Sequence, residues 1–377
     1  MIYLLKHLAL TIICISTFWS HSRANPEDIS HSNFIPKPKI LVTGGMGYIG
    51  SHVSLVLLEA GYEVVIVDNL SNSNIRVLER IEKISQGKVS QFYQCDMSIS
   101  GCVEPIFQDH KISGVIHLAG LKAVGESVAR PLTYFHNNLY ASINLLRSME
   151  DAGVKALIFS SSATVYGNPK YLPLDEQHDL SVTNPYGRTK LQIENILMDL
   201  AHSSKDWNLI SLRYFNPIGA HPSGLIGEDP LGIPNNLLPY IIRVISGKLP
   251  SLSIYGNDYD TKDGTGVRDY IHVMDLAEGH LAALKYLEKN NKTSFLPINL
   301  GTGEGYSVLD IINAFKANGV IVPFKYAPRR DGDIASSYAD ATKAKQLLGW
   351  STKRDLNDMI KDSLTWANKN PNGYRDR

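Results

Sequence analysis

Short apolar runs alternate with longer helical stretches from residue 40 to the end of the chain. The apolar runs predict buried strands at 40–43, 64–67, 91–93, 115–118 and 157–159. The stretches between and after them predict helices at 74–85, 137–151 and 185–202. This alternation is typical of βαβ units. We therefore expect an α/β fold whose centre is a doubly wound parallel sheet of the Rossmann type.

The composition is that of a globular protein of about two domains. The chain has 377 residues, 44% hydrophobic and 20% charged, so a core can form. Its 37 Lys plus Arg balance its 37 Asp plus Glu, which argues against a nucleic-acid-binding surface. The histidines and cysteines show no metal-ligand spacing, so we expect no metal. Cys14, Cys95 and Cys102 form no CxxC pair and are too few for a disulfide framework.

The first 38 residues differ in character from the rest. Residues 8–19 form an apolar run behind Lys6 and His7, too short to cross a bilayer as a helix but long enough for a signal-peptide core. Ser22, Arg23 and Ala24 resemble a cleavage site, and the polar stretch 25–38 is typical of a linker. We expect a signal-like segment and linker at 1–38; the alternative is a dispensable leader.

A glycine-rich turn follows the first predicted strand and leads into a helix. Gly44, Gly47 and Gly50 permit a tight turn, close approach to a pyrophosphate and close helix packing. The next strand ends at Asp68, 24 residues after Gly44, where a carboxylate can accept the hydroxyls of an adenosine ribose and repel a 2′-phosphate. No Lys or Arg follows directly. The pattern therefore predicts NAD rather than NADP.

Further polar side chains lie at or just past the ends of predicted strands. Asp68, Asp96, Lys122 and Ser162 occupy such positions. Ligands of parallel α/β sheets bind at the carboxyl ends of the strands. We therefore expect these side chains to gather around one site.

The helix opened by Pro185 carries a second constellation. Tyr186 and Lys190 are four positions apart and share a helix face. A tyrosine pKa of ~10 makes a poor base at neutral pH, but a cation about 4 Å away at a dielectric of ~20 is worth ~4 kcal/mol, or about three pKa units. Lys190 and a nicotinamide ring are thus predicted to bring the pKa of Tyr186 to about 7. Ser162 is expected to link the substrate hydroxyl to the phenol; the alternative is an ordinary surface pair.

The sequence from 39 to about 372 resembles the UDP-glucose 4-epimerases of the extended short-chain dehydrogenase/reductase family. The resemblance rests on the strings TGGMGYIGSH, DNLSNS, HLAGLKAVGES, FSSSATVYG, NPYGRTK, RYFNPIGAHPSG, GEDPLGIPNNLLPY, GTGVRDYIHVMDLAEGH and APRRDGD. The leader before Lys39 has no counterpart in compact family members.

The resemblance implies site residues, a homodimer and two domains. It places NAD binding at 39–212 and UDP-sugar binding in a smaller mixed α/β domain at 213–377, partly interleaved with the first. The residues implied to bind NAD are Gly44, Gly47, Tyr48, Ile49, Gly50, Asp68, Asn69, Leu70, Ser71, Asn72, Ser73, Asp96, Met97, Leu118, Ala119, Gly120, Leu121, Lys122, Asn137, Ser162, Tyr186, Lys190 and Phe215. Those implied to bind the UDP-sugar are Ser162, Tyr186, Asn216, Asn236, Leu237, Ser253, Tyr255, Arg268, Arg330, Asp333 and Ser337.

The implied reaction is a redox epimerisation with Ser162, Tyr186 and Lys190 as catalytic residues. The C4 hydrogen of a hexose is not acidic, so direct deprotonation is excluded. Instead Tyr186 takes the 4-OH proton while hydride passes to NAD, and the 4-keto sugar turns and takes hydride back on its other face. UDP-glucose and UDP-galactose are thereby interconverted. Ser337 stands where relatives carry a bulky Tyr or a small residue, which extends the expectation to UDP-GlcNAc and UDP-GalNAc.

Alternative functions are weighed by particular residues. Related dehydratases carry an Asp-Glu pair where this chain has Ala163 and Thr164, and decarboxylating relatives carry a Glu at the second position, which disfavours both. Another NAD-dependent nucleotide-sugar epimerase remains open. So does an inactive NAD-binding regulator, although such a protein would be expected to lose its catalytic residues.

Two further expectations concern a glycine turn and the location of the protein. The turn 301–305 (GTGEG) looks like a nucleotide loop, but we expect it to end a strand before a helix from Ser307, with no cofactor role. The chemistry needs cellular nucleotide pools and favours the cytoplasm, in conflict with the signal-like leader. We expect the cytoplasm.

Overall fold

The computed structural model describes residues 38–232, 234, 236–290, 293–330 and 332–375. The predicted leader at 1–38 therefore lies almost wholly outside the described residues. The described residues between 38 and 375 form one compact unit. Within the described residues, no helix combines the length and apolar character needed to cross a membrane.

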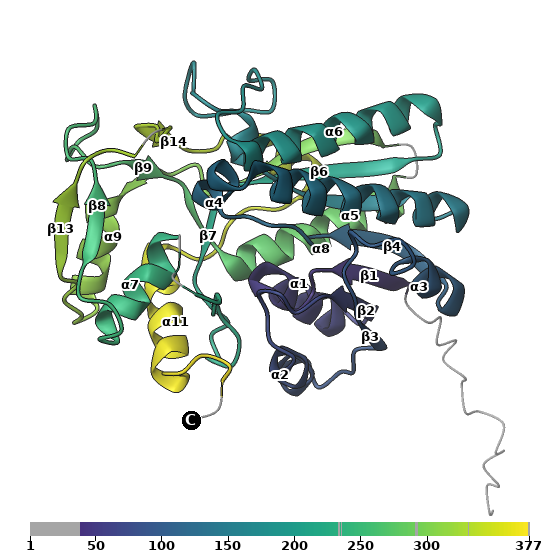
Figure 1. Ribbon diagram of the computed structural model, residues 1–377, viewed down its shortest axis with the longest axis horizontal. Helices are drawn as coiled ribbons and strands as arrows, with labels where there is room; N and C mark the ends of the chain where they lie inside the picture. Colours follow the sequence, from purple (N-terminus) through teal and green to yellow (C-terminus); the bar gives the residue numbers. More distant parts are fainter. Residues whose placement is uncertain (1–37, 233, 235, 291–292, 331, 376–377) are drawn as a thin grey trace, which may run out of the picture. The chain divides into compact units, whose positions relative to one another are not determined.

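A parallel sheet of seven strands forms the centre of this unit (Figure 1). Every pairing in it is parallel. The spatial order is β11-β6-β5-β4-β1-β2-β3. The strands are β1 (Lys39–Thr43), β2 (Glu63–Asp68), β3 (Gln91–Gln94), β4 (Ile112–His117), β5 (Ala156–Ser162), β6 (Asn208–Tyr214) and β11 (Ser294–Leu300). The doubly wound Rossmann fold predicted from the sequence is confirmed.

Helices cover both faces of the sheet because its strands are apolar on both sides. The helices of this part are α1 (Tyr48–Glu59), α2 (Arg76–Ser85), α3 (Glu104–Asp109), α4 (Val124–Ala129), α5 (Pro131–Asp151), α6 (Pro185–Ser203), α8 (Val273–Lys289) and α10 (Thr342–Leu348). Ile40 and Val42 of β1 join one core with α1, α2 and α8, whereas Leu41 between them joins a second core with α5 and α6. Successive side chains of a strand thus bury opposite helix layers.

Two predicted helices begin elsewhere than expected. The helix predicted at 137–151 begins six residues earlier, at Pro131, because proline suits the first turn, where its missing N–H leaves no hydrogen bond unmade. The helix predicted at 74–85 begins at Arg76, because the Asn74 side chain accepts the Arg76 amide in a local turn. The helix predicted at 185–202 is observed at Pro185–Ser203.

The order of the strands reverses at β1, which lies between β2 and β4. Such a switch point is where ligands of open α/β sheets bind. The Thr43 hydroxyl ties the two strand ends together by accepting the amides of Leu118 (3.1 Å) and Ala119 (3.2 Å). Gly44 follows at φ 66°, and a Cβ there would lie 2.8 Å from the Ala119 nitrogen. Glycine is therefore required at the first turn.

A second group of elements packs around its own core. It contains the strand pairs β7 (Asn216–Ile218) with β10 (Tyr270–His272) and β8 (Leu252–Tyr255) with β13 (Phe324–Ala327), the set β9 (Val267–Arg268), β12 (Tyr306–Ser307) and β14 (Ser336–Ser337), and the helices α7 (Leu237–Ile245), α9 (Val308–Ala317) and α11 (Leu356–Lys369). Its core includes Ile241, Phe315 and Ile360. The chain enters this group after β6, leaves it at α8 and rejoins the sheet as β11. The sheet part and this second group are therefore interleaved in the sequence.

One covalent link was not predicted from the cysteines. Cys95 and Cys102 form a disulfide across the loop after β3. A sequence separation of seven carries no recognisable spacing signal, and only the fold brings the two sulfurs together. The loop they close contains Asp96 and Met97, two of the residues implied to bind NAD.

Candidate active site

The catalytic helix α6 is fixed at its start by local capping. The Asn184 side chain accepts the amide of Gly187 at 2.8 Å, and Pro185 occupies the first turn. Tyr186 and Lys190 then fall on one face, as predicted. The Ser162 end of β5 lies beside them, close enough for its hydroxyl to lower the pKa of Tyr186 against the effect of burial.

The ammonium of Lys190 is buried and points along the end of β5. Its Nζ donates to the Ser160 carbonyl at 2.6 Å. It lies 4.9 Å from the ring centroid of Phe159 and 5.9 Å from that of Tyr186. The lysine therefore holds helix to strand and keeps a positive charge near the phenol.

In the chain without NAD, burial raises the pKa of Tyr186, and the Ser162 hydroxyl opposes the rise only in part. The ammonium of Lys190 is directed at the Ser160 carbonyl rather than at the phenolic oxygen. The lowering of this pKa by Lys190 together with a nicotinamide ring stays a prediction.

Lys190→Met is expected to abolish a pH dependence of folding stability. Burial lowers the pKa of Lys190 from 10.5 to about 8. Between these two values the unfolded chain binds a proton that the folded chain does not, so stability rises with pH across this window and not below it. We expect the wild type to gain roughly 2–3 kcal/mol relative to the variant. Unfolding at about pH 7.5, 9 and 10.5 measures this; parallel curves for both proteins would contradict it.

The carboxylate of Asp68 organises the turn beside the glycine loop. It accepts the amides of Met46 (3.1 Å) and Leu70 (2.9 Å) and the hydroxyl of Ser73 (2.8 Å). Asn69 in turn donates to Asp96 at 3.3 Å. The structure thus brings together the predicted cofactor residues that follow β2 and β3.

These residues fit a dinucleotide. Helix α1 starts with no capping side chain and no acidic residue in its first turn, so its amides remain for an anion. A Cβ on Gly50 would lie 2.1 Å from the Gly44 oxygen, which keeps helix and turn in close contact. Asp68 stands at the adjacent strand end. NAD would be held by the α1 amides, Asp68 and the residues after β4.

Asn138 is a positioning residue that the sequence did not reveal. It is 2% exposed, and its Oδ1 accepts the Leu121 amide at 2.8 Å. Its Nδ2 donates to the Leu121 carbonyl (3.1 Å) and to Thr189 Oγ1 (3.0 Å). It therefore connects the loop after β4 to the catalytic helix. The neighbouring Asn137, which the resemblance implies to bind NAD, stays a prediction.

Five of the residues implied to bind the UDP-sugar fall into two clusters. Arg330 pairs with Asp333 at 2.8 Å and lies 4.7 Å above the ring of Tyr255. Arg268 and Ser337 are register partners in β9 and β14. Ser337 is 8% exposed.

Other residues implied to bind ligand lie outside these two clusters. Asn216 is exposed at the start of β7, and Asn236 and Leu237 begin α7. Ser253 lies in β8, and Phe215 is buried behind β6.

The glycine turn after β11 is occupied by the chain's own carboxylate. Asp269, fully buried, accepts the Thr302 amide (2.8 Å), the Thr302 hydroxyl (2.6 Å), the Gly303 amide (3.0 Å) and the Ala339 amide (3.1 Å). The turn follows β11, and Ser307 caps the next helix, as expected. Its donors face Asp269 rather than a ligand.

No candidate metal site is found among the residues that the structure describes. Across those residues, no group of three His, Cys, Asp or Glu side chains is arranged to hold an ion. The absence of a metal remains a prediction.

A Rossmann sheet with a glycine turn, a strand-end aspartate and a Ser-Tyr-Lys set defines an NAD-dependent enzyme of the extended short-chain dehydrogenase/reductase class. A family described as GDP-mannose 4,6 dehydratase matches residues 41–363. UDP-glucose 4-epimerase of Bacillus subtilis is 56% identical over 337 residues, 89% of this chain and 98% of that protein. The enzyme of the same name from Dictyostelium discoideum is 54% identical over 90% of this chain and 98% of its own.

Solved structures agree with these relatives. UDP-glucose 4-epimerase of Bifidobacterium longum in complex with NAD⁺ and UDP has a TM-score of 0.86 at 51% identity, covering 89% of this chain and 99% of that one. The Stenotrophomonas maltophila UDP-glucose-4-epimerase with bound NAD and formylated UDP-arabinopyranose has a TM-score of 0.85 at 50% identity. The match covers 88% of this chain and 98% of that one. The chain belongs to the UDP-glucose 4-epimerase family.

Proposed function

We propose that the protein interconverts UDP-glucose and UDP-galactose through a transient 4-keto sugar, with NAD held throughout. One observation carries this: Ser162, Tyr186 and Lys190 converge at the sheet's switch-point edge, while Ala163 and Thr164 supply no carboxylate for elimination. A redox step at C4 is then the chemistry that these side chains support.

Each catalytic side chain has a separate task. Tyr186 accepts the proton of the sugar 4-OH and returns it after the sugar has turned. Ser162, whose hydroxyl lies near the phenol, links the sugar hydroxyl to it by hydrogen bonding. Lys190 fixes α6 on β5 through the Ser160 carbonyl and places its ammonium 5.9 Å from the ring centroid of Tyr186. Bound NAD supplies the hydride acceptor and donor.

The second group of elements holds the nucleotide part of the substrate. Arg268 and Arg330 are proposed to bind the diphosphate, because a guanidinium donates paired hydrogen bonds to phosphate oxygens. Asn216, Asn236, Leu237 and the backbone at 253–255 complete the anchor. A firm hold on UDP leaves the sugar free to turn between the two half-reactions.

A turnover assay without added NAD tests this function. The purified protein is expected to carry NAD and to convert UDP-galactose to UDP-glucose with no net consumption of NAD. Stoichiometric reduction of added NAD would indicate a dehydrogenase. Bound NAD with no turnover on any UDP-sugar would indicate a regulator.

Ser337→Tyr is expected to narrow the substrate range. We propose that the small side chain leaves room for a 2-acetamido group, so that UDP-GlcNAc and UDP-GalNAc are also interconverted. A tyrosine would fill that room, and overpacking of ~1–3 kcal/mol gives roughly 5- to 150-fold discrimination. The specificity constants of both substrate pairs measure this in wild type and variant. Equal slowing of both pairs, or a wild type inactive on the acetylated pair, would contradict it.

We propose a homodimer formed through α4 and α5. Leu132, Tyr140 and Ile143 form an exposed stripe along α5, with Leu132 81% and Tyr140 55% exposed, and Val124 and Val128 of α4 are exposed as well. Exposed apolar patches of this kind mark association surfaces. We expect analytical ultracentrifugation to give a molecular mass of twice the 41.8 kDa of one chain.

We propose that the enzyme works in the cytoplasm, where NAD and UDP-sugars are available. The signal-like leader and the Cys95–Cys102 disulfide favour an oxidising compartment instead. Cell fractionation with alkylation of free thiols decides between them. Recovery outside the cytoplasm with both cysteines bonded would contradict the proposal.

A further inference from the structure

The segment 219–232, here called the strap, follows β7 and touches the cofactor side of the site at three places. Each contact is a hydrogen bond to a residue implied to bind NAD. These are Tyr48 Oη to the Gly219 carbonyl (2.8 Å), Lys122 Nζ to Glu228 Oε1 (2.8 Å) and the Leu231 amide to Asn72 Oδ1 (3.0 Å). The strap thus contacts the first residue of α1, the loop after β2 and the loop after β4, all in the NAD-binding half.

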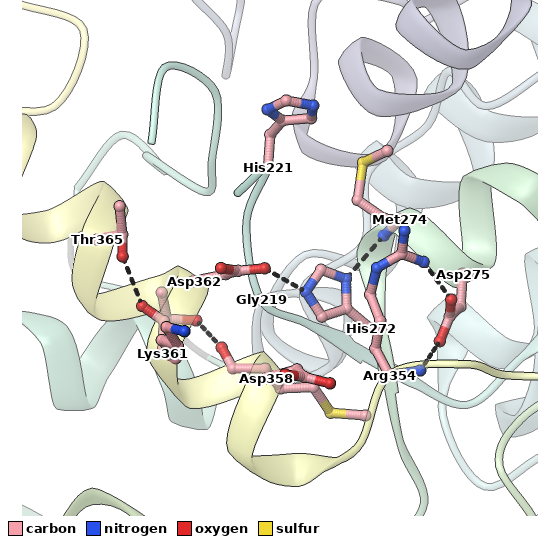
Figure 2. Close-up of polar contacts among 12 residues, drawn as sticks. Gly219, His221, His272, Met274, Asp275, Arg354, Asp358, Lys361, Asp362 and Thr365 are labelled. Atoms are coloured by element: carbon pink, nitrogen blue, oxygen red, sulfur yellow. Dashed lines mark hydrogen bonds and ion pairs between the residues drawn. The ribbon is translucent and has the colours of Figure 1, made fainter. Parts of the chain in front are cut away.

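The beginning of the strap is fixed by packing. Figure 2 shows Gly219 beside His272, where a Cβ on the glycine would lie 3.0 Å from His272 Nε2. His272 Nδ1 accepts the Met274 amide at 3.0 Å, so its proton is on Nε2 and is donated to Asp362 at 3.2 Å. The strap therefore starts from a rigid point between β10 and α11.

Its middle is held just as firmly around Glu228. The hydroxyl of Tyr374 donates to the Gly227 carbonyl (3.0 Å), and the Tyr374 amide donates to Asp229 (3.0 Å). The residues on both sides of Glu228 are thereby bound to one buried tyrosine. The backbone at Glu228 has little freedom, and its side chain has a defined direction.

The Glu228 carboxylate thereby lies between the cofactor side and the substrate side of the site. Glu228 is 9% exposed, and its Oε1 accepts from Lys122 and from Asn236 Nδ2 (3.4 Å). Lys122 belongs to the cofactor side, and Asn236 stands at the start of α7 on the substrate side. After burial itself, the charge of Glu228 is the next cause that raises the pKa of Tyr48. Its charge therefore also acts at the first residue of α1.

We propose that Glu228 is a positioning residue for UDP-sugar binding. Its carboxylate accepts hydrogen bonds from both Lys122 and Asn236. The placement of Asn236 on the substrate side therefore depends on Lys122 on the NAD side. The inference rests on the proposed function of the same site. An ordinary surface ion pair would contribute little to any property, because both charges stay in water. Here the acid is nearly buried and serves two partners.

The test is a pair of double-mutant cycles on the full chain with NAD in excess. Glu228→Gln keeps the shape and removes the charge, and is expected to raise KM for UDP-galactose about fivefold while kcat stays within about twofold. The same substitution should add nothing to the KM of Lys122→Met or of Asn236→Ala, because the linked residues act as one unit. Asp179→Asn, which breaks the exposed pair with Lys170, is the matched control and should change neither constant.

Each outcome decides the proposal. An unchanged KM in Glu228→Gln, an additive effect in either background, or a fall in kcat alone would overturn it. Glu228→Asp keeps the charge with a shorter reach and should give an intermediate KM; a KM as high as that of Glu228→Gln would also contradict the proposal. Turnover of the wild type is measured first, so that its absence refutes the proposed function and not the role of Glu228.

Discussion

Tyr186→Phe is expected to keep NAD and UDP-sugar bound while turnover falls by ~10²–10⁴-fold. The substitution removes one oxygen, which is the proposed proton acceptor, and leaves the ring and the α6 backbone in place. Both kcat and kcat/KM should fall together, because the lost interaction belongs to the transition state. Steady-state kinetics with UDP-galactose, together with the amount of NAD released on denaturation, measure the two halves of this expectation.

Tyr171→Phe provides the matched control. Tyr171 is 47% exposed, and its hydroxyl donates only to Asp175 in a surface loop. The same loss of oxygen there should leave kinetics unchanged. Near-normal turnover of Tyr186→Phe would show that another group takes the proton and that the mechanism is wrong.

Glu194→Gln is expected to lower stability by ~3–5 kcal/mol, since it leaves a buried guanidinium without its counter-charge. Glu194 and Arg213 are 1% and 3% exposed and pair at 2.7 Å. Glu194 also accepts the Ser211 hydroxyl at 2.8 Å. The pair joins α6 to β6, and the charge of Glu194 raises the pKa of Lys190 against the effect of burial. Thermal and urea unfolding of variant and wild type measure the loss.

A double substitution distinguishes the loss of the whole ion pair from the loss of one of its charges. Glu194→Leu with Arg213→Met replaces both charges by apolar groups of similar size, and this should destabilise less than Glu194→Gln. A loss below about 1 kcal/mol in Glu194→Gln would contradict the role of this pair.

The same pair explains why the sequence did not reveal strand β6. Its segment NLISLRY carries Ser211 and Arg213 at positions that point into the structure, so the apolar pattern is broken. Both are satisfied by Glu194, which lies on another element. Periodicity detects burial of apolar groups and cannot detect a polar group whose partner comes from elsewhere in the chain.

Local features were predictable because short spacings determine them. The glycine turn, Asp68 at the end of β2, and Tyr186 with Lys190 on one helix face follow from a few neighbouring residues. The pairing of Lys122 with Glu228 spans 106 positions and left no local signal. The disulfide between Cys95 and Cys102 and the burial of Asp269 in a glycine turn likewise depend on tertiary structure.

The return of the chain to its first sheet has a consequence for any attempt to divide the protein. A fragment ending at 212 would cut off the last two residues of β6 and lack β11 and α8, so the shortened β6 would become an open edge and the core shared by β1 and α1 would lose the α8 layer. The sugar-binding elements of this enzyme therefore cannot be moved to another protein as a separate domain. New specificity would have to be introduced by point changes within the intact chain, because neither half can be exchanged without rebuilding the other.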